Sequence, residues 1–425
     1  MTKRDRVAGT HRVPGDKSIT HRALMLAALG RGVSHIEGAL TSLDARSTAR
    51  VLRQLGATIT PLRTAGGVTV RGRARFTQPR DTLHCGNSGT TARLLLGLLA
   101  GHPFRCRLTG DASLRRRPMR RVTEPLGAMG ARVEDRGHDG LPLEISGGQL
   151  HPIDWPLSVP SAQIKSALLL AGVAGQVPVT IRGGEGSRDH TERMLRHLGY
   201  DVASRDEMLR FAPTGKLAAF DLSVPGDPSS AAFLIAASLL ADDGELAITG
   251  VGLNPTRTGY FAIMAQMGAT LAVETGADSF GEPVGTVVSQ PSSLQAVDVA
   301  SDAIPGIIDE LPILACLAAR ATGTSRFRSV AELRVKESDR LALMVSNLRA
   351  VGVEAAAEGD DLVVQGTDAP LAGRVTTGGD HRIAMAFMVL GRQHGARIRV
   401  DDPDCAAVSF PGFAAALGRL SGGGQ

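Results

Sequence analysis

The stretch PGDKSITHRALMLAALG, residues 14–30, contains a pattern that the rest of the chain repeats. A Pro-Gly turn, a Lys-Ser pair and a His-Arg pair lead into small apolar residues, which predicts a helix that ends at Gly30. A helix start has unbonded backbone N–H groups and a partial positive charge, and therefore suits an anion. Lys17, Ser18 and Arg22 fall in its first turns, which predicts a phosphate or carboxylate site. An ordinary amphipathic helix with solvated basic ends would also explain a single copy.

The pattern occurs six times. Each copy begins with polar residues suited to capping, continues through Ala and Leu, and stops near a glycine. The closing glycines follow at intervals of roughly 70 residues, at Gly30, Gly101, Gly175, Gly244, Gly323 and Gly395. These helices are apolar on nearly all faces, so we expect them to be buried.

A second, amphipathic helix alternates with each apolar one. Its copies read as a helix, a glycine stop and a strand, at residues 51–59, 125–133, 194–202, 263–271 and 347–355, with residues 413–420 as a truncated sixth copy. The unit is thus an apolar helix, a strand, an amphipathic helix and a strand pair. This alternation predicts an α/β (α+β) fold.

Six units divide most simply into two lobes of three. VPGDPSS (224–230) closely echoes VPGDKS (13–18), so we expect the chain to cross between lobes at both turns. The predicted amino-terminal lobe is 15–225, and the discontinuous carboxy-terminal lobe is 1–14 plus 226–425. If six helix starts face one interlobe cleft, their dipoles would attract an anion.

Composition favours a small acidic ligand. The formal net charge of +5 and the pI near 9.3 suggest acidic partners. Aromatic residues are only 3%, too few to stack many bases of single-stranded nucleic acid. No run approaches the roughly 18 apolar residues of a membrane span, and the start lacks the apolar run of a signal peptide. Four cysteines without paired spacing predict a reduced, cytoplasmic protein with no disulfide or zinc site.

The helix starts carry polar residues that capping alone does not explain. Ser, Asn and Asp routinely cap helices, and capping accounts for Ser229 and Ser230. Lys17, Arg22, Gln163 and Arg382 are not cap residues. The full set comprises Lys17, Ser18, Asn87, Ser88, Ser161, Gln163, Ser229, Ser230, Asp309, Asp380, His381 and Arg382.

Two charged clusters lie outside this set. In LRRRPMRR (114–121), the proline fixes how Arg117 leaves the chain. In LRVKESDR (333–340), Lys336 and Arg340 would be i,i+4 neighbours on a helix, an unfavourable pair unless an anion lies between them. Solvated charged surfaces are the alternative for both clusters.

Familiar motifs are absent. GDKS (15–18) lacks the adjacent Gly-Lys of a P-loop. HTERMLRH (190–197) lacks the zinc-site order and a third ligand, so we expect His190 and His197 to be structural and predict no metal site.

Together the motifs resemble those of the 5-enolpyruvylshikimate-3-phosphate (EPSP) synthase family, in that family's order and over nearly the whole chain. They are PGDKSITHRA, GNSGTTAR, RRRPMRR, SAQIKSALLLAG, LRVKESDRL and GGDHRIAMAF. RPMRR, SAQIK, RDHTE and NPTR further resemble its class II branch. The resemblance implies two similar lobes, each of three βαβαββ repeats with buried parallel helices (inverse α/β barrel-like), joined by two crossings around an active-site cleft.

The resemblance also implies the reaction. The enolpyruvyl (carboxyvinyl) group of phosphoenolpyruvate passes to the 5-hydroxyl of shikimate 3-phosphate by addition and elimination, and phosphate is released. This step belongs to the shikimate pathway to chorismate and aromatic amino acids, and the enzyme is a glyphosate target. No metal or organic cofactor, no nucleic acid and no membrane are implied, and we expect a monomer.

Residue roles follow from the resemblance, position by position. Contacts to shikimate 3-phosphate are implied for Lys17, Ser18, Arg22, Ser161, Gln163, Arg188, Asp309 and Lys336. Contacts to phosphoenolpyruvate are implied for Lys17, Gly89, Arg117, Gln163, Arg340 and Arg382. Catalytic roles are implied for Asp309, Glu337, Lys336 and Lys17. Our hypothesis is that Glu337, beside Lys336, protonates the vinyl carbon, while Asp309 takes the hydroxyl proton.

Two positions leave glyphosate sensitivity open. Val408 stands where many class I members have a lysine, and Gly89 is retained where some herbicide-insensitive class II members have alanine. The nearest alternative is the sister enolpyruvyl transferase of UDP-N-acetylglucosamine, but its reactive cysteine is missing from GDASLRRRPMRR (110–121). A basic RNA-binding repeat protein would explain the pI, but not the shortage of aromatic residues.

Overall fold

The computed structural model describes residues 5–63, 67–135 and 137–421, and the chain divides into two compact units. The amino-terminal unit consists of Gly15–Val224 and Asp278–Glu282. The carboxy-terminal unit consists of Met1–Pro14, Pro225–Ala277 and Pro283–Gln425. The sequence repeat gave no indication that Asp278–Glu282 would group with the amino-terminal unit.

The amino-terminal unit contains three four-stranded sheets, in the orders β13-β2-β4-β3, β5-β6-β8-β7 and β11-β12-β10-β9. Its helices are α1 (Lys17–Leu29), α2 (Leu43–Gln54), α3 (Gly89–Ala100), α4 (Ala112–Arg116), α5 (Arg120–Ala128), α6 (Ala162–Gly175) and α7 (His190–His197). Its strands are β2 (Arg31–Glu37), β3 (Thr58–Ile59), β4 (Val68–Arg73), β5 (Leu83–His84), β6 (Arg105–Thr109), β7 (Arg132–Glu134), β8 (Leu143–Ser146), β9 (Ile153–Pro156), β10 (Val179–Arg182), β11 (Asp201–Arg205), β12 (Met208–Ala212) and β13 (Asp221–Ser223).

The carboxy-terminal unit contains sheets in the orders β1-β14-β16-β15, β17-β18-β20-β19 and β21-β22. Its helices are α8 (Pro228–Leu239), α9 (Gly259–Gln266), α10 (Ile304–Ile307), α11 (Leu311–Ala318), α12 (Arg340–Ala350), α13 (His381–Leu390) and α14 (Phe413–Ser421), with 3-10 helices η1 (Ala331–Val335) and η2 (Pro403–Val408). Its strands are β1 (Gly9–His11), β14 (Leu246–Gly252), β15 (Thr270–Thr275), β16 (Val284–Gln290), β17 (Asp298–Val299), β18 (Thr324–Phe327), β19 (Ala355–Glu358), β20 (Asp361–Gln365), β21 (Ala372–Val375) and β22 (Arg397–Val400).

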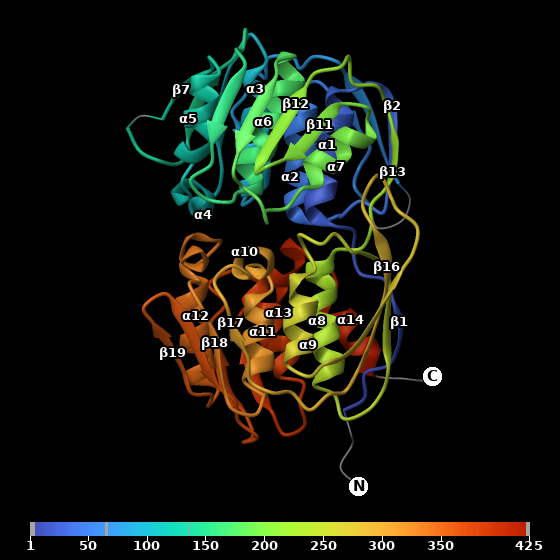
Figure 1. The fold of residues 1–425 in the computed structure, drawn as a ribbon, viewed down its shortest axis with the longest axis vertical. Helices are drawn as coiled ribbons and strands as arrows, with labels where there is room; N and C mark the ends of the chain where they lie inside the picture. Colours follow the sequence, from blue (N-terminus) through green and yellow to red (C-terminus); the bar gives the residue numbers. More distant parts are fainter. Residues whose placement is uncertain (1–4, 64–66, 136, 422–425) are drawn as a thin grey trace. The chain divides into compact units, whose positions relative to one another are not determined.

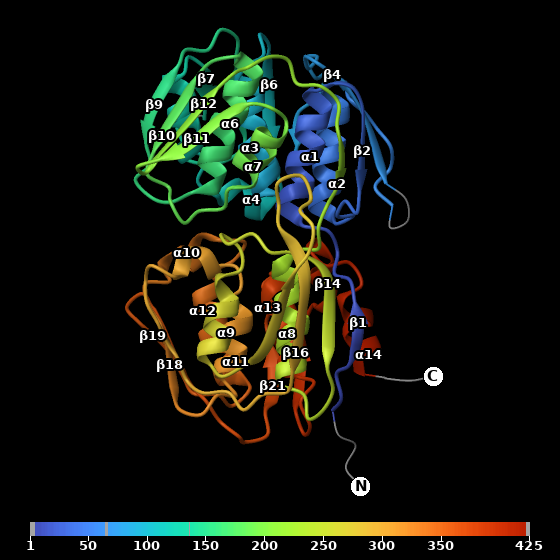
Figure 2. The ribbon, with the colours of Figure 1, turned by 45° about the vertical axis from the view of Figure 1, so that its right-hand side comes forward.

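One pairing rule runs through the sheets. The strand before an apolar helix lies parallel to the strand after it, as in β5 and β6 around α3, β9 and β10 around α6, and β17 and β18 around α11. The first repeat of each unit is an exception, because each takes this leading strand from the segment that precedes the apolar helix of the other. β1 precedes α1 in the chain but pairs with β14, which follows α8, while β13 precedes α8 but pairs with β2, which follows α1. Figure 2 shows the blue β1 beside β14.

The apolar helices are buried, as their composition predicts. Every residue of α8 and α11 is buried, and α1, α3, α6 and α13 are buried over most of their length. In the carboxy-terminal unit α8, α11 and α13 contact one another and run side by side (Figure 1). In the amino-terminal unit α3 packs against α6 and α1. Because side chains along these helices face the cores, polar groups are confined mostly to the first turns.

The caps of these helices differ from expectation at one position. Asp16, Ser88, Ser161 and Asp380 accept hydrogen bonds from the first turns of α1, α3, α6 and α13. Ser229 and Ser230 do not cap α8. Asp227 does, through the N–H of Ser229 at 2.8 Å. α8 begins at the residue after this cap, Pro228. A proline is tolerated there because the N–H groups of the first turn have no partner within the helix.

Two histidines of α7 hold the segment Asp278–Glu282, which lies between β15 and β16 in the chain. Nδ1 of His190 is 2.7 Å from Oε1 of Glu282, and both side chains are buried. The ring of His197 lies 4.1 Å from the ring of Phe280. Their expected structural role is therefore confirmed.

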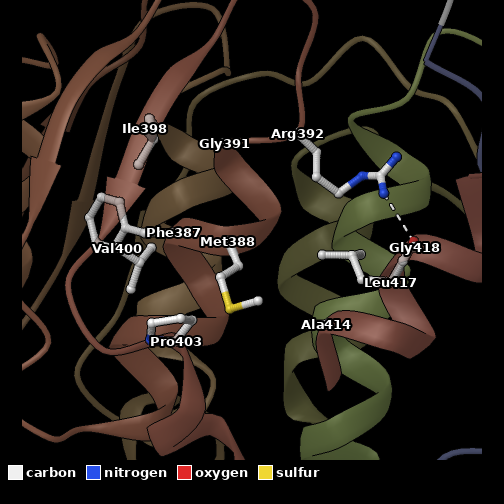
Figure 3. A pocket seen from close by; sticks show the side chains of 10 residues that line it. All are labelled: Phe387, Met388, Gly391, Arg392, Ile398, Val400, Pro403, Ala414, Leu417 and Gly418. Atoms are coloured by element: carbon white, nitrogen blue, oxygen red, sulfur yellow. Dashed lines mark hydrogen bonds between the residues drawn. The ribbon is translucent and has the colours of Figure 1, made fainter. Parts of the chain in front are cut away.

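The sixth repeat has a two-stranded sheet, and η2 and α14 follow it. Arg392 anchors α14 by donating to the carbonyl of Leu417 at 2.9 Å (Figure 3). A largely apolar pocket of about 380 Å³ opens here, lined by Phe387, Met388, Gly391, Arg392, Ile398, Val400, Pro403, Ala414, Leu417 and Gly418. It contains none of the predicted site residues. None of the helices in the described part of the chain is long and apolar enough to span a bilayer.

Close packing of α3 on α6 gives a test of the core. A Cβ at Gly97 would lie 2.0 Å from the carbonyl oxygen of Ala167, so Gly97→Ala must push the helices apart. We expect a loss of about 1–3 kcal/mol in the free energy of unfolding, measured by urea denaturation. Gly127→Ala in α5 is the matched control, because a Cβ there meets nothing within 4 Å, and it should gain about 0.5–1 kcal/mol. Equal stability of the two variants would contradict the packing.

Candidate functional site

The predicted site residues form two groups, one in each unit. The amino-terminal group comprises Lys17, Ser18, Arg22, Gly89, Arg117, Ser161, Gln163 and Arg188. The carboxy-terminal group comprises Asp309, Lys336, Glu337, Arg340 and Arg382. In both units, most of these residues lie at or near the start of a helix.

Lys17 is the first residue of α1. Asp16 caps the helix by accepting from the N–H of Ile19 at 2.8 Å. The ammonium group of Lys17 lies 2.6 Å from a carboxylate oxygen of Asp44 on α2, and its side chain is 19% exposed. The carbonyl of Ser18 accepts from Arg22 at 2.9 Å. An ion-paired but reachable ammonium group thus stands at a helix start.

Arg22 is buried and joins three helices. Its Nε donates to Thr191 Oγ1 of α7 at 2.6 Å, and a second guanidinium nitrogen donates to Ser166 Oγ of α6 at 2.7 Å. Burial lowers the pKa of Arg22 to about 10, so it stays charged at neutral pH. The half-buried Arg188 precedes α7, and its charge also acts to lower this pKa. The two arginines therefore form one positive region.

Gln163 links the starts of α6 and α3. Its Oε1 accepts from Arg93 at 2.5 Å, and its Nε2 donates to Thr90 Oγ1 at 3.3 Å. Arg93 also donates to the carbonyl of Pro118 at 2.9 Å. The sequence interpretation missed Arg93. It lies four residues after Gly89, as Arg22 lies four after Ser18, and that shared spacing is the signal that would have found it. Ser161 caps α6 next to this contact.

Gly89 leaves room for two guanidinium groups at the start of α3. A Cβ at this position would lie 3.3 Å from Arg117 and 3.4 Å from Arg93. Arg117 follows α4 and donates to the side-chain oxygen of Asn87 and, at 3.2 Å, to Ser113 Oγ. The helix start and the two arginines together form a strongly anion-favouring region.

A chain of buried hydrogen bonds stiffens these helix starts. It runs from Nδ1 of His21 to Thr48 Oγ1 at 2.7 Å, on to Thr91 Oγ1 at 2.6 Å, and then to Ser88 Oγ at 2.7 Å. Burial lowers the pKa of His21 to about 3, so the ring is neutral at neutral pH. The chain therefore holds α1, α2 and α3 together without adding charge.

Arg340 is the centre of the carboxy-terminal group. Its buried guanidinium lies 2.8 Å from Asp380, 2.6 Å from Glu337 and 3.3 Å from Asp309. Burial alone would lower the pKa of Arg340, but the three negative charges outweigh it and raise the pKa. Burial acts to raise the pKa of Asp380, and the charge of Arg340 overcomes it and lowers the pKa.

Arg382 holds the other side of Asp309. One guanidinium nitrogen donates to the Asp309 carbonyl at 2.8 Å, and another lies 3.4 Å from its carboxylate. Asp380 caps α13 by accepting from the N–H of Arg382 at 2.9 Å. Asp309 therefore lies between two arginines that come from two different helices.

Lys336 and Arg340 do not share a helix, so that expectation is wrong. η1 ends at Val335, Lys336 has extended backbone, and Asp339 caps α12 through Ala342 at 2.9 Å. Because the cap starts a new helix, Lys336 is separated from Arg340 and pairs with a different carboxylate. Lys336 lies 3.4 Å from Glu332, and desolvation lowers its pKa.

The two groups differ in chemistry. The amino-terminal group is rich in cations at helix starts, which suits phosphate and carboxylate binding. In the carboxy-terminal group the side chains of Asp309 and Glu337 are 17% and 26% exposed, whereas Asp380 is fully buried. Only Asp309 and Glu337 of these three are therefore reachable for proton transfer. Across the described ranges, no cluster of three or more His, Cys, Asp or Glu could hold a metal ion.

Known proteins similar to this chain match it over nearly its whole length, and they agree with one another. A model of the family described as EPSP synthase (3-phosphoshikimate 1-carboxyvinyltransferase) matches residues 1–417. The chain is 48% identical to the 3-phosphoshikimate 1-carboxyvinyltransferase of Gluconobacter oxydans over 424 residues, covering 98% of this chain and 96% of that relative. It is 48% identical over 416 residues to a Thermus thermophilus protein of the same name, covering 97% and 96%.

Solved structures confirm the predicted α/β fold. The EPSP synthase from Acinetobacter baumannii matches with a TM-score of 0.86 and 37% identity, covering 99% of this chain and 97% of that one. The enolpyruvyl transferase NikO from Streptomyces tendae matches with a TM-score of 0.76, covering 98% and 95%. At 20% identity, NikO supports the fold alone.

Without the positive charge of Arg340, the repulsion among its three carboxylate partners should be uncompensated and should destabilise the fold. We expect Arg340→Met to cost about 3–5 kcal/mol in the free energy of unfolding at pH 7, because buried charges lose their partner. In the unchanged chain the pKa of Asp380 is lower when folded than the ordinary aspartate pKa of about 3.9. This difference stabilises the fold at any pH above about 3.9, and the stabilisation is lost as the pH falls through the lower pKa of the folded state. In the variant these carboxylates take up protons on acidification, so its deficit should shrink between pH 7 and pH 5 in urea titrations.

The matched control for this prediction is Arg328→Met. Arg328 is exposed and pairs with Asp298 at 2.5 Å. An exposed pair contributes only about 0–1 kcal/mol. A loss for Arg340→Met no larger than for this control would contradict the central role of Arg340.

Proposed function

The chain belongs to the EPSP synthase family, and we propose that it transfers the carboxyvinyl group of phosphoenolpyruvate to the 5-hydroxyl of shikimate 3-phosphate, releasing phosphate. It is accordingly a transferase of alkyl groups other than methyl, acting in the shikimate pathway to chorismate and aromatic amino acids. The observation that carries the proposal is the family match over residues 1–417, which includes both site groups.

The finer assignments rest on the motifs. RPMRR, SAQIK, RDHTE and NPTR support placement in the class II branch. The resemblance supports a cytoplasmic monomer that needs no metal or organic cofactor. We also propose that each of the predicted lobes, 15–225 and 1–14 plus 226–425, contributes one of the two groups of substrate contacts.

The charges of the two groups support the assignment of ligands. Phosphoenolpyruvate carries a phosphate and a carboxylate close together, which suits several bidentate arginines. Its proposed contacts are Lys17, Gly89, Arg117, Gln163, Arg340 and Arg382. The proposed contacts of shikimate 3-phosphate are Lys17, Ser18, Arg22, Ser161, Gln163, Arg188, Asp309 and Lys336. Arg93 joins the phosphoenolpyruvate set, since it borders Gly89 together with Arg117.

The proposed addition step uses the two reachable carboxyl groups. Glu337 gives a proton to the methylene carbon of phosphoenolpyruvate, and the 5-oxygen of shikimate 3-phosphate bonds to the adjacent carbon. Asp309 takes the proton of that hydroxyl. An anion that takes Arg340 from Glu337 breaks a 2.6 Å ion pair, and a carboxyl group outside an ion pair holds a proton more readily. Lys336 is next to Glu337, and its lowered pKa suits it to resupply the proton.

The proposed elimination step forms the enol ether of the product. In the tetrahedral intermediate one carbon bears both the 5-oxygen of shikimate 3-phosphate and the phosphate. Glu337, now a carboxylate, takes a proton back from the neighbouring methyl carbon, the electron pair of that C–H bond forms the double bond, and the bond to phosphate breaks. Lys17 and the arginines of the amino-terminal group are suited to the charge of the departing phosphate.

The cysteines count against the sister transferase. Burial raises the pKa of Cys85, Cys106 and Cys405 to about 12, and burial also raises that of Cys316. A nucleophilic cysteine needs a lowered pKa, so these thiols do not suit that role.

A direct assay tests the proposed function. The purified chain is supplied with phosphoenolpyruvate and shikimate 3-phosphate, and phosphate release is followed. We expect release that depends on both substrates. Release only with UDP-N-acetylglucosamine would assign the chain to the sister activity, and no release between pH 6 and 9 would refute the proposal.

Glu337→Gln tests the proposed acid. The amide keeps the shape of the side chain but cannot give up a proton, so kcat should fall by at least about 100-fold while both KM values change little. Glu358→Gln is the control, because Glu358 pairs with Arg326 at the surface and is 54% exposed, and it should retain normal turnover. Unchanged turnover in Glu337→Gln would remove this residue from its role.

A further inference from the structure

We propose that Glu310 is a positioning residue that holds the guanidinium of Arg382 in place when phosphoenolpyruvate displaces Asp309 from it. This inference rests on the proposed function and adds a role for a buried carboxylate that the family motifs do not assign. Glu310 follows Asp309 directly in the sequence and precedes α11.

Glu310 is held in the interior of the carboxy-terminal unit. It is 1% exposed, and Ser229 Oγ of α8 donates to its Oε1. Although it stands at the N-cap position of α11, its side chain makes no capping hydrogen bond. A buried carboxylate away from a cap needs a positive partner, because an uncompensated charge is costly in the interior.

A second buried arginine fixes the serine. Arg257 is 2% exposed and donates to Ser229 Oγ at 2.9 Å and to Asp227 Oδ1 at 3.0 Å. Asp227 in turn caps α8. The orientation of the Glu310 carboxylate is therefore set by a network anchored at the turn before α8.

Arg382 lies between two consecutive carboxylates of unequal exposure. Its guanidinium is 3.4 Å from Asp309, whose side chain is 17% exposed, and 3.9 Å from Glu310, which is buried. An incoming anion reaches Asp309 from solvent and can replace it. Glu310 is enclosed and bonded to Ser229, so it remains as the constant counter-charge.

This difference in exposure matters because the proposed reaction requires two changes at the ion pair between Arg382 and Asp309. Arg382 must bind the substrate anion, and Asp309 must leave Arg382 to accept a proton. Without the charge of Glu310, Arg382 would rely more on Asp309, and the substrate would have to compete with that pair. A simple like-charge view predicts the opposite, since removing a carboxylate near an anion site would strengthen anion binding.

The experiment is a steady-state comparison of Glu310→Gln with the unchanged chain. The amide keeps the shape and the contact with Ser229 but removes the charge. We expect the KM for phosphoenolpyruvate to rise about tenfold, which is well within the attraction of two unit charges at the 3.9 Å that separates Arg382 from Glu310. The KM for shikimate 3-phosphate should rise far less, and kcat should fall. An unchanged or lower KM for phosphoenolpyruvate would overturn the proposal.

Ser229→Ala provides a second route if Glu310→Gln fails to fold. It leaves the Glu310 charge but removes the group that orients it, so the KM for phosphoenolpyruvate should rise by a smaller factor. In the double variant, the serine change should add nothing to the effect of Glu310→Gln, because both act through the same carboxylate. Additive effects would contradict the network.

The matched control is Asp5→Asn. This carboxylate is also partly buried and ion-paired, at 2.6 Å from Arg392, in the same unit. It should lose stability without changing either KM, whereas an equal rise in KM would show that Glu310 acts only through stability. If the unchanged chain does not turn over its two substrates, the proposed function fails, and not this inference alone.

Discussion

The burial of the apolar helices constrains the rest of the molecule. α8 and α11 have no exposed residue, and the other apolar helices have few, so a polar side chain in the middle of one would lose its water without a partner. Polar groups therefore gather at the helix starts, where capping side chains and unbonded N–H groups accommodate them. Arg340 and Arg382 follow the same rule at the starts of α12 and α13. The packing of the core thus decides where the chemistry lies.

The same burial makes several cations of the site depend on a carboxylate. Lys17 pairs with Asp44, Lys336 with Glu332, and Arg340 with three carboxylates. In the proposed reaction, an anionic substrate that binds one of these cations exchanges with its carboxylate. The proposed binding and proton-transfer steps are in this way coupled by charge. The distances between the charged groups rank the ion pairs. The contacts of Asp309 with its arginines, at 3.3 and 3.4 Å, are longer than the 2.6 Å contact of Glu337. The proposed base, Asp309, is thus held less tightly than the proposed acid, Glu337.

The sequence predicted what depends on local pattern. The six apolar helices and their polar starts follow from side-chain periodicity and capping, so the arginines and acids at those starts were located. The predicted glycine stops hold at the ends of α1 and α3, whereas α8, α11 and α13 end several residues before Gly244, Gly323 and Gly395. Contacts between distant segments carry no such pattern. Nothing local pairs Glu282 with His190, or Arg93 with Gln163. The interpretation also failed where a cap competes with a longer helix, since Asp339 starts α12 and separates Lys336 from Arg340. Local rules identified the chemical groups, and long-range packing selected their partners.

The exchange of β1 and β13 between the two first repeats adds a constraint on folding that the number of repeats does not reveal. In the later repeats the parallel strand pair brackets its own helix, so each forms from continuous chain. The first repeat of the carboxy-terminal unit instead takes β1 from before α1, by pairing Gly9–His11 with β14. A chain that began after the amino-terminal unit would leave that edge of β14 without its partner, and an unpaired edge is a site for misassociation. Because α8 packs on β14 and begins at the Asp227 cap, completion of this sheet also supports the turn that orients Ser229 and Glu310. The amino-terminal residues therefore bear on the site although they are distant from it in the sequence.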